Sequence, residues 1–206
     1  MSLRDATAED VAIYGTSANR LAVGDDLRVV SRGNADRTTI YGAEIDWQMQ
    51  LYFLPAPLNG LGLGANYTYS KSEETIPFIE TLARDHASQP ARAGQSVAYP
   101  KQPNHTGNFY VGFQKWGFDA RFAGNYTGKN LRQYNTGSAT LDQYNSARWR
   151  YDVIVNYRLS RQWSLSASIV NLNDEPLVTW EGTPTRVRNS EFLGRTSRLA
   201  VRYVFR

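Results

Sequence analysis

The sequence predicts an all-β fold, an antiparallel transmembrane β-barrel segment of about seven long strands. Three observations predict it. From Thr38 onward, apolar and polar residues alternate with a period of two over long runs. The connections between the runs are alternately short and long. The chain is also rich in aromatic residues, with 13 Tyr, 8 Phe and 5 Trp, which favour strands and membrane interfaces.

The first run shows the alternation most clearly. Ile45 and Trp47 alternate there with Glu44 and Asp46, so that one face is apolar and the other is polar and charged. The seven predicted runs cover residues 41–53, 61–70, 108–114, 118–127, 149–159, 163–170 and 198–206. Most are about ten residues long, which suits a tilted membrane strand, whereas strands of soluble proteins average roughly five or six residues.

The connections predict the direction of each strand. The short ones cover 55–60, 115–117 and 160–162, and the long ones cover 71–105, 128–147 and 172–194. Outer-membrane barrels have short periplasmic turns and longer extracellular loops, so the last strand should run inward and the C-terminus should be periplasmic. We therefore expect 1–35 to be an extracellular loop region with the possible end of a preceding strand at 27–31, and 36–206 to hold the barrel strands.

The alternative fold is a soluble β-sandwich in which the apolar faces pack together. A sandwich predicts shorter strands, with turns at a spacing of roughly 8–12 residues. The polar faces here include Arg121, Asp152 and Arg158, which suit a wet or plugged lumen. These features favour the membrane barrel by roughly four to one.

Composition excludes several other classes. No run of about 18 apolar residues is present for a membrane helix, and the absence of cysteine excludes disulfide scaffolds and zinc–thiolate sites. The net charge of +4 is mild and the basic residues are scattered, so we expect no nucleic-acid partner. Met1–Asp5 shows no apolar signal-peptide core, which favours a fragment of a secreted protein with an added start.

Several segments, in this order, resemble one family, the TonB-dependent outer-membrane receptors. They are Ile40-Tyr41-Gly42-Ala43-Glu44-Ile45, Gly64-Ala65-Asn66-Tyr67-Thr68-Tyr69-Ser70, Tyr99-Pro100-Lys101-Gln102-Pro103-Asn104-His105, Asn125-Tyr126-Thr127-Gly128, Tyr157-Arg158-Leu159 with Trp163-Ser164-Leu165, Asn171-Leu172-Asn173-Asp174-Glu175-Pro176, and Gly194-Arg195-Thr196. The resemblance covers about 36–206. It implies roughly the last third of a receptor, because family barrels have about 22 strands around a plug domain. Family barrels usually end on an aromatic residue, whereas Arg206 follows Phe205 here.

The resemblance implies TonB-energised uptake of a scarce ligand, with a ferric siderophore as the expected cargo and the TonB complex acting through a plug that this chain lacks. Glu44 and Asp46 are the candidate contacts to arginines of the plug. Extracellular loops carry recognition in the family, and arginines and aromatics there suit an anionic ferric chelate or a sugar. The candidate loop residues are Arg84, His86, Arg92, Arg132, Tyr134, Tyr144, Trp180, Arg186 and Arg188.

We expect Trp47, Trp116, Trp149 and Trp163 to lie at the membrane interfaces, in contact with lipid and lipopolysaccharide. The two histidines, His86 and His105, have no convergent partners in the sequence, so we expect no metal site, cofactor or catalytic centre. Two other functions remain open. One is a small self-contained barrel acting as a pore or structural protein, for which 1–35 must supply an eighth strand; the other, ranked last, is a barrel hydrolase.

Overall fold

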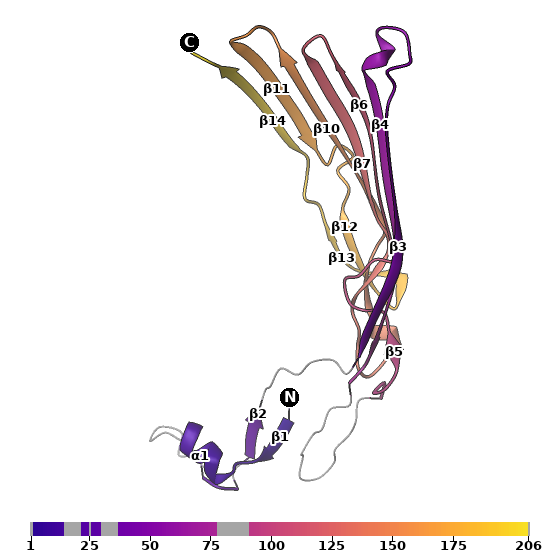
Figure 1. The fold of residues 1–206 in the computed structure, drawn as a ribbon. Helices are drawn as coiled ribbons and strands as arrows, with labels where there is room; N and C mark the ends of the chain where they lie inside the picture. Colours follow the sequence, from indigo (N-terminus) through magenta and orange to yellow (C-terminus); the bar gives the residue numbers. More distant parts are fainter. Residues whose placement is uncertain (1, 15–21, 25, 30–36, 78–90, 206) are drawn as a thin grey trace. The chain divides into compact units, whose positions relative to one another are not determined.

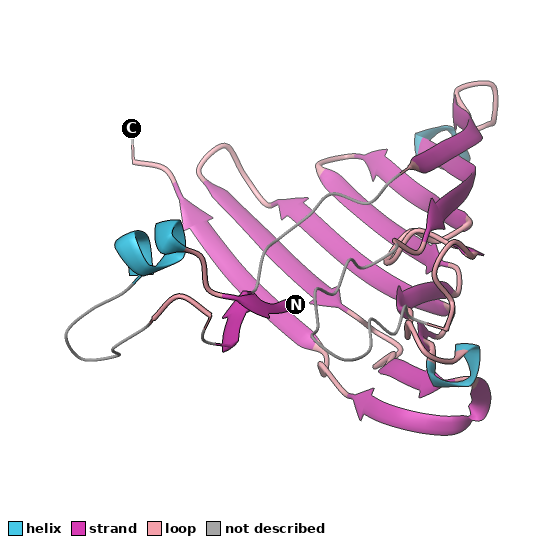
Figure 2. Cartoon of the chain, turned by 90° about the horizontal axis from the view of Figure 1, so that it is seen from below, coloured by secondary structure: helices cyan, strands magenta, loops and turns pink. Residues whose placement is uncertain are grey.

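The computed structural model of the chain describes residues 2–14, 22–24, 26–29, 37–77 and 91–205. The chain divides into two compact units. The first unit comprises Met1–Thr38, Glu73–Val97 and Thr136–Ser138, and the second comprises Thr39–Ser72, Ala98–Asn135 and Ala139–Arg206. Strands account for most of the described residues, and the helices are short (Figure 2). Among the described helices, none combines the length and the apolar character of a membrane span.

The second unit is dominated by one large sheet, here called the main sheet. Seven of its eight strands follow each other in space as they do along the chain, in the order β14-β11-β10-β7-β6-β4-β3 (Figure 1). They are β3 (Thr38–Gln50), β4 (Leu61–Thr75), β6 (His105–Lys115), β7 (Phe118–Thr127), β10 (Arg148–Arg158), β11 (Trp163–Val170) and β14 (Thr196–Tyr203). The strand pairs from β4 to β14 are all antiparallel, which confirms the predicted fold class, and each of the seven predicted runs contains a strand of this sheet.

The register of the main sheet places like residues opposite one another. Leu63, Val111, Phe122, Val153 and Ile169 form one row across five strands. The side that carries this row is called the apolar face below. Because side chains alternate between the faces, the neighbouring rows point to the other side, called the polar face. One such row is Asn66, Asn108, Asn125 and Arg150.

The apolar face is not covered by a second layer. Ile45 is 69% exposed and Leu199 is 78% exposed. The buried hydrophobic residues among those described are Ala6, Ile76, Leu131 and Trp180, and none of them lies in a strand of the main sheet. A soluble sandwich would bury this face in its core. The structure therefore contradicts the sandwich and agrees with a sheet whose apolar side faces lipid.

The main sheet is open rather than closed. Strands β3 and β14 each have a single neighbour in the sheet order, so each leaves one edge unpaired within the described residues. Closed barrels are the form in which strands span a bilayer, because a free edge leaves backbone groups without partners. An open sheet of this kind is what a segment of a larger barrel presents.

The short connections are tight turns, as predicted. Lys115 pairs with Phe118, and the two residues between them, Trp116 and Gly117, both have positive φ, 52° and 79°. Positive φ at both central residues defines the type I′ turn that suits the twist of a hairpin. In the last short link, the Ser160 hydroxyl accepts hydrogen bonds from the backbone N–H groups of Gln162 and Trp163.

The first predicted run ends earlier than expected. Strand β3 stops at Gln50, and Leu51–Phe53 belongs to the following turn. The Leu51 N–H donates to the Leu61 carbonyl, which is the last bond of this hairpin, and the Leu54 N–H turns back to the Leu51 carbonyl. Conversely, β4 runs on to Thr75, five residues beyond the predicted end at Ser70.

Two of the long connections hold a second sheet, here called the loop sheet, where the alternation predicted loops. Its order is β13-β12-β9-β8 and its pairs are antiparallel. The strands are β8 (Asn130–Gln133), β9 (Gln143–Asn145), β12 (Leu177–Glu181) and β13 (Thr183–Glu191). Register shifts within β12 and β8 interrupt the two-residue period, which explains why the pattern missed them.

The first unit contains a small separate sheet. Strands β1 (Ser2–Asp5) and β2 (Asp26–Val29) pair with each other in an antiparallel ladder and are not part of the main sheet. Between them lies helix α1 (Ala8–Tyr14), capped by Thr7 and Asp10, whose side chains each accept from the other's backbone N–H. The strand expected at 27–31 is thus β2, with β1 as its partner. The two-residue strand β5 (Ser96–Val97) pairs with the end of β4.

Candidate ligand-binding site

Most of the predicted loop residues that the structure describes contact other side chains of the protein, and two of them, Arg92 and Trp180, are buried. Arg92 is buried, and its Nε donates to the Gln95 side chain at 3.2 Å. Trp180 is 6% exposed and stacks on Tyr144 with ring centroids 4.4 Å apart. Arg132 donates through Nη1 to the Thr179 hydroxyl at 3.0 Å. Arg84 and His86 lie outside the described residues.

The remaining loop candidates are also engaged. Arg186 and Arg188 both form ion pairs with Glu181, at 2.6 and 2.5 Å. Tyr134 is half-buried. Lys129, which the sequence analysis did not select, lies over the rings of Tyr144 and Trp180 at 5.3 and 5.7 Å from their centroids. The loop sheet therefore uses many of the predicted recognition residues for its own cohesion.

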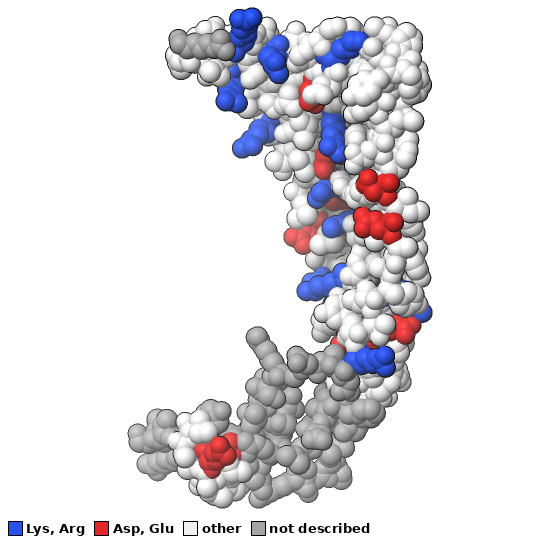
Figure 3. All heavy atoms as spheres, viewed as in Figure 1, with Lys and Arg blue, Asp and Glu red and all other residues white. Residues whose placement is uncertain are grey.

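The polar face of the main sheet carries many polar and charged side chains close to one another. Asn108 donates to Asn66 across β6 and β4 at 2.8 Å, and Asn125 donates to Asp152 across β7 and β10 at 3.4 Å. Arg121 lies over the ring of Tyr110, 4.0 Å from its centroid. Lys and Arg predominate over Asp and Glu in the upper part of the view in Figure 3.

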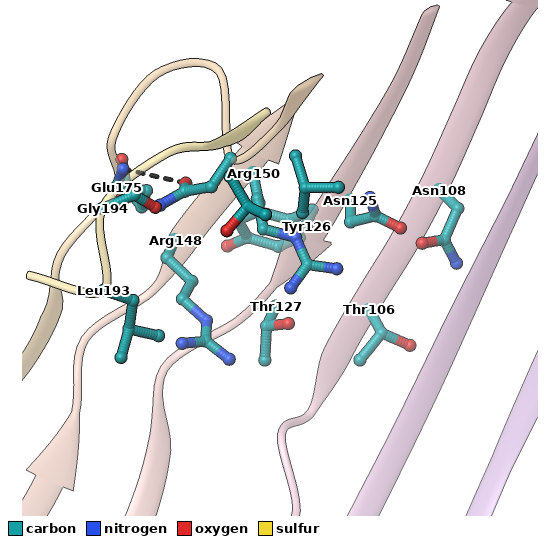
Figure 4. A pocket seen from close by; sticks show the side chains of 13 residues that line it. Thr106, Asn108, Asn125, Tyr126, Thr127, Arg148, Arg150, Glu175, Leu193 and Gly194 are labelled. Carbon is teal, nitrogen blue, oxygen red and sulfur yellow. Dashed lines mark hydrogen bonds between the residues drawn. The ribbon is translucent and has the colours of Figure 1, made fainter. Parts of the chain in front are cut away.

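A pocket of about 450 Å³ opens on this face, over β6, β7 and β10 (Figure 4). Its polar lining comes mostly from strand residues of alternating position. The lining residues are Thr106, Asn108, Asn125, Tyr126, Thr127, Arg148, Arg150, Val170, Asn171, Glu175, Leu193, Gly194 and Thr196. The volume lies in the usual range for small-molecule sites, about 300–1,000 Å³. Arg148 and Arg150 were not among the predicted site residues, although Arg150 lies in the predicted run 149–159 and Arg148 directly precedes it.

The segment Asn171–Glu175 ties the pocket wall together. Asn171 is buried and has a φ of 59°. Its side chain donates to the Gly194 carbonyl at 3.0 Å and accepts from the Glu175 N–H at 3.0 Å. Its backbone N–H donates to Asp152 at 2.9 Å. A single asparagine thus joins β10 to the two segments that close the pocket.

Asn173 extends the same arrangement along β10. Its amide donates to the Trp149 carbonyl at 2.8 Å and accepts from the Tyr151 N–H at 3.1 Å. These two backbone groups flank Arg150. On the side of β10 that faces β11 they have no partner in the neighbouring strand, because the β10–β11 ladder begins at Val153. The side chain therefore takes the place of a strand residue and fixes the backbone on which Arg150 stands.

Replacing the buried Asn171 with alanine is expected to destabilise the protein by about 1–3 kcal/mol, because the partly buried Gly194 carbonyl and Glu175 N–H lose their partner. Glycine at the same position removes the same hydrogen bonds but accepts positive φ without strain. The Asn171→Gly variant should therefore be the more stable of the two, by roughly 0.4–1 kcal/mol or more. Denaturant unfolding of both variants measures the difference in their free energies of unfolding. Equal stability would show that the positive φ at position 171 does not destabilise the alanine variant.

Carboxylates on β3 complete the polar face. Glu44 and Asp46 are both exposed. Asp46 lines a second pocket together with Asn66, Asn108 and Arg121. The Gln48 side-chain amide donates a hydrogen bond of 3.4 Å to the Asp46 carboxylate. Contact between these carboxylates and a plug remains a prediction, which a comparison of plug stability between the wild type and the Glu44→Gln variant would test.

The four tryptophans predicted at the interfaces are all exposed: Trp47, Trp116, Trp149 and Trp163. Trp149 stacks on Tyr151 and packs in a tilted arrangement against Tyr126 at one end of the strands. Trp163 packs against Tyr203 at the opposite end, close to the short turns. Two aromatic groups at opposite ends of one apolar face are typical of the girdles of membrane barrels. Their depth in a bilayer remains a prediction.

The described residues show no centre for metal chemistry. No three His, Cys, Asp or Glu side chains among them come together as metal ligands would. His105 accepts or donates a short hydrogen bond of 2.6 Å with the Tyr67 hydroxyl and packs against Tyr69, 5.4 Å between centroids. It therefore belongs to an aromatic group on the apolar face.

The comparisons with known proteins agree with this architecture. A family model described as TonB dependent receptor-like, beta-barrel, matches residues 6–172, which is well over half of the chain and includes β3 to β11. No curated protein and no solved structure gives a match. The long antiparallel strands, the exposed apolar face and the polar face with its pocket are the features expected of such a barrel wall. The chain belongs to the family of TonB-dependent receptor β-barrels, transport receptors of the bacterial outer membrane.

Proposed function

We propose that the chain forms part of the wall of a receptor for TonB-energised uptake of a scarce small ligand, with a ferric siderophore as the cargo. The observation that carries the proposal is the family match over 6–172. The pocket on the polar face supports it, because Arg148 and Arg150 line a cavity of small-molecule size on the side that would face the lumen. The exposed apolar face supports contact with lipid and lipopolysaccharide on the other side.

Uptake of radioactive iron(III) supplied with a panel of chelators tests this function. In cells that depend on this receptor for iron, accumulation is expected with at least one chelate and should disappear when TonB is deleted. A strain without the receptor controls for other routes. Equal accumulation with and without TonB would contradict energised transport.

The self-contained pore, the alternative function, needs a closed barrel. In the described residues the main sheet is open at β3 and β14, and β1 and β2 pair with each other instead of supplying an eighth strand. These observations favour the receptor wall. Ion conductance in planar bilayers by this chain alone would reverse the preference.

We also propose that the short turns are periplasmic, and with them the C-terminus, and that the loop sheet is extracellular. The chain contains no cysteine, so single cysteines can be introduced without background. Arg161 lies in a short link and Thr183 begins β13 in the loop sheet, and both are exposed. With a membrane-impermeant maleimide, the Thr183→Cys variant should react in intact cells, whereas Arg161→Cys should react after the outer membrane is opened. The reverse pattern would invert the proposed orientation.

A further inference from the structure

We infer that the pocket over β6, β7 and β10 binds a small organic anion through its carboxylate groups, with Arg148 and Arg150 as the residues that contact it. This inference rests on the proposed function and narrows it, because it names the chemical class of the cargo. It also moves recognition from the extracellular connections to the wall of the sheet.

The pocket floor is a regular grid set by the register. Arg148 lies opposite Thr127, which lies opposite Thr106. Two residues further along β10, Arg150 lies opposite Asn125, which lies opposite Asn108. Two guanidinium groups thus stand beside two hydroxyls and two amides on one face (Figure 4). Guanidinium donors match the two oxygens of a carboxylate, and amides and hydroxyls match a ligand's hydroxyl groups.

The two arginines are available for a ligand. Arg148 forms no ion pair with any residue that the structure describes. Arg150 has one long contact, 3.7 Å from its Nε to Asp152, and its side chain is 51% exposed. Asp152 in turn accepts from the Asn171 N–H and from Asn125, so its charge is shared with neutral donors. Arg186 and Arg188, by contrast, share the carboxylate of Glu181 at much shorter distances.

The charge of the pocket favours an anion. Its lining contains two arginines and one carboxylate, that of Glu175, which accepts a hydrogen bond from Asn173 at 3.1 Å. Val170 and Leu193 add apolar surface at the rim nearest the connections. A ligand that carries carboxylates and hydroxyls together with a modest apolar part meets all of these groups. A cationic ligand meets two positive charges instead, of which one, Arg150, has only a long contact with Asp152.

The test uses the complete receptor, purified in detergent, and three probes: iron(III) citrate, a neutral iron(III) trihydroxamate and maltotriose. Iron(III) citrate is expected to bind, and the two neutral probes are not. Because each arginine would donate charge-assisted hydrogen bonds to a carboxylate, Arg148→Gln or Arg150→Gln should weaken binding about tenfold or more, and the double variant about 100-fold. Arg→Lys should weaken it less, since charge remains but the bidentate geometry is lost.

A matched control is available on the same strands. Arg158 and Arg202 line a different pocket at the other end of the polar face, each opposite Ser164. The double variant Arg158→Gln/Arg202→Gln removes the same net charge and should leave binding within about twofold if long-range electrostatics are minor. Circular dichroism and heat-modified gel mobility establish that all variants are folded.

Three results would overturn the inference: no binding of iron(III) citrate, unchanged binding in the Arg148→Gln/Arg150→Gln variant, or an equal loss in the control variant. Failure of the proposed function has a different signature. Binding that depends on Arg148 and Arg150 in the purified receptor, together with cellular uptake that does not need TonB, would sustain the site and reject energised transport.

Discussion

Replacing Val153 with arginine is expected to destabilise the receptor in a lipid bilayer by about 2–4 kcal/mol. Val153 lies on the apolar face of β10, opposite Phe122 and Ile169. It also lies midway between Trp149 and Tyr157, which belong to the aromatic groups at the two ends of the strands. An arginine at this depth in the bilayer lies far from water on either side. The free energy of transferring its charge into hydrocarbon therefore destabilises the folded receptor.

The neighbouring residue supplies the control. Ile154 is also β-branched and apolar, but it points to the polar face, opposite Arg121 and Ser168. The Ile154→Arg variant places two arginines opposite each other in a hydrated environment, so its cost should stay near or below about 1 kcal/mol. Urea unfolding of the receptor in lipid vesicles measures both. Equal costs, or a larger cost for Ile154→Arg, would mean that the assignment of the two faces is wrong.

The strands of the main sheet could be predicted because each residue has one of two environments. Strands β7 and β11 begin and end where the alternation placed them, at Phe118–Thr127 and Trp163–Val170. The pattern is strong there because lipid and water impose opposite requirements on alternate positions. Leu51–Phe53 continued the alternation in sequence without continuing the strand, since the Leu51–Leu61 bond closes the hairpin first.

The loop sheet could not be predicted from periodicity. Strand β9 has three residues and β8 has four, too few to establish a two-residue period. The cohesion of this sheet comes from long-range pairs such as Tyr144 with Trp180 and Arg132 with Thr179, separated by dozens of residues in the chain. Residue type alone predicted ligand contacts for these side chains, and that prediction stays open; their contacts with one another depend on packing and register, which the sequence pattern does not contain.

Part of the pocket follows from features visible in the sequence. Arg150 falls on the polar phase of a predicted strand, and the Asn171–Glu175 segment was recognised as a family feature. Register cannot be predicted from the alternation: Arg150 lies beside Asn125 through the ladder that joins β10 to β7, and Asn125 lies beside Asn108 through the β6–β7 hairpin. The alternation predicts the face of a residue, and the ladder determines its neighbours across strands.

The Trp180→Ala variant is expected to destabilise the loop sheet by about 3–5 kcal/mol while leaving the main sheet intact. Trp180 packs on Tyr144 of β9, and Lys129 lies over both rings. Removing the indole leaves a cavity at the centre of a sheet whose buried hydrophobic side chains among the described residues are Leu131 and Trp180. Amide hydrogen exchange should therefore accelerate in β8, β9 and β12 and stay unchanged in β7 and β10.

Trp116→Ala is the matched control, since Trp116 lies in a hairpin turn of the main sheet and is 69% exposed. It should leave exchange in the loop sheet unchanged. If Trp180→Ala accelerates exchange in β10 as strongly as in β12, the two sheets unfold together, and the loop sheet is part of the stability of the barrel wall. If exchange is unchanged throughout, the stack of Trp180 on Tyr144 contributes little to the stability of the loop sheet. A role of these two residues in ligand recognition would then be favoured. Selective loss of protection in the loop sheet would instead mean that the long connections form a folded unit of their own, and Arg148 and Arg150 of the main sheet would remain as the candidates for binding the cargo.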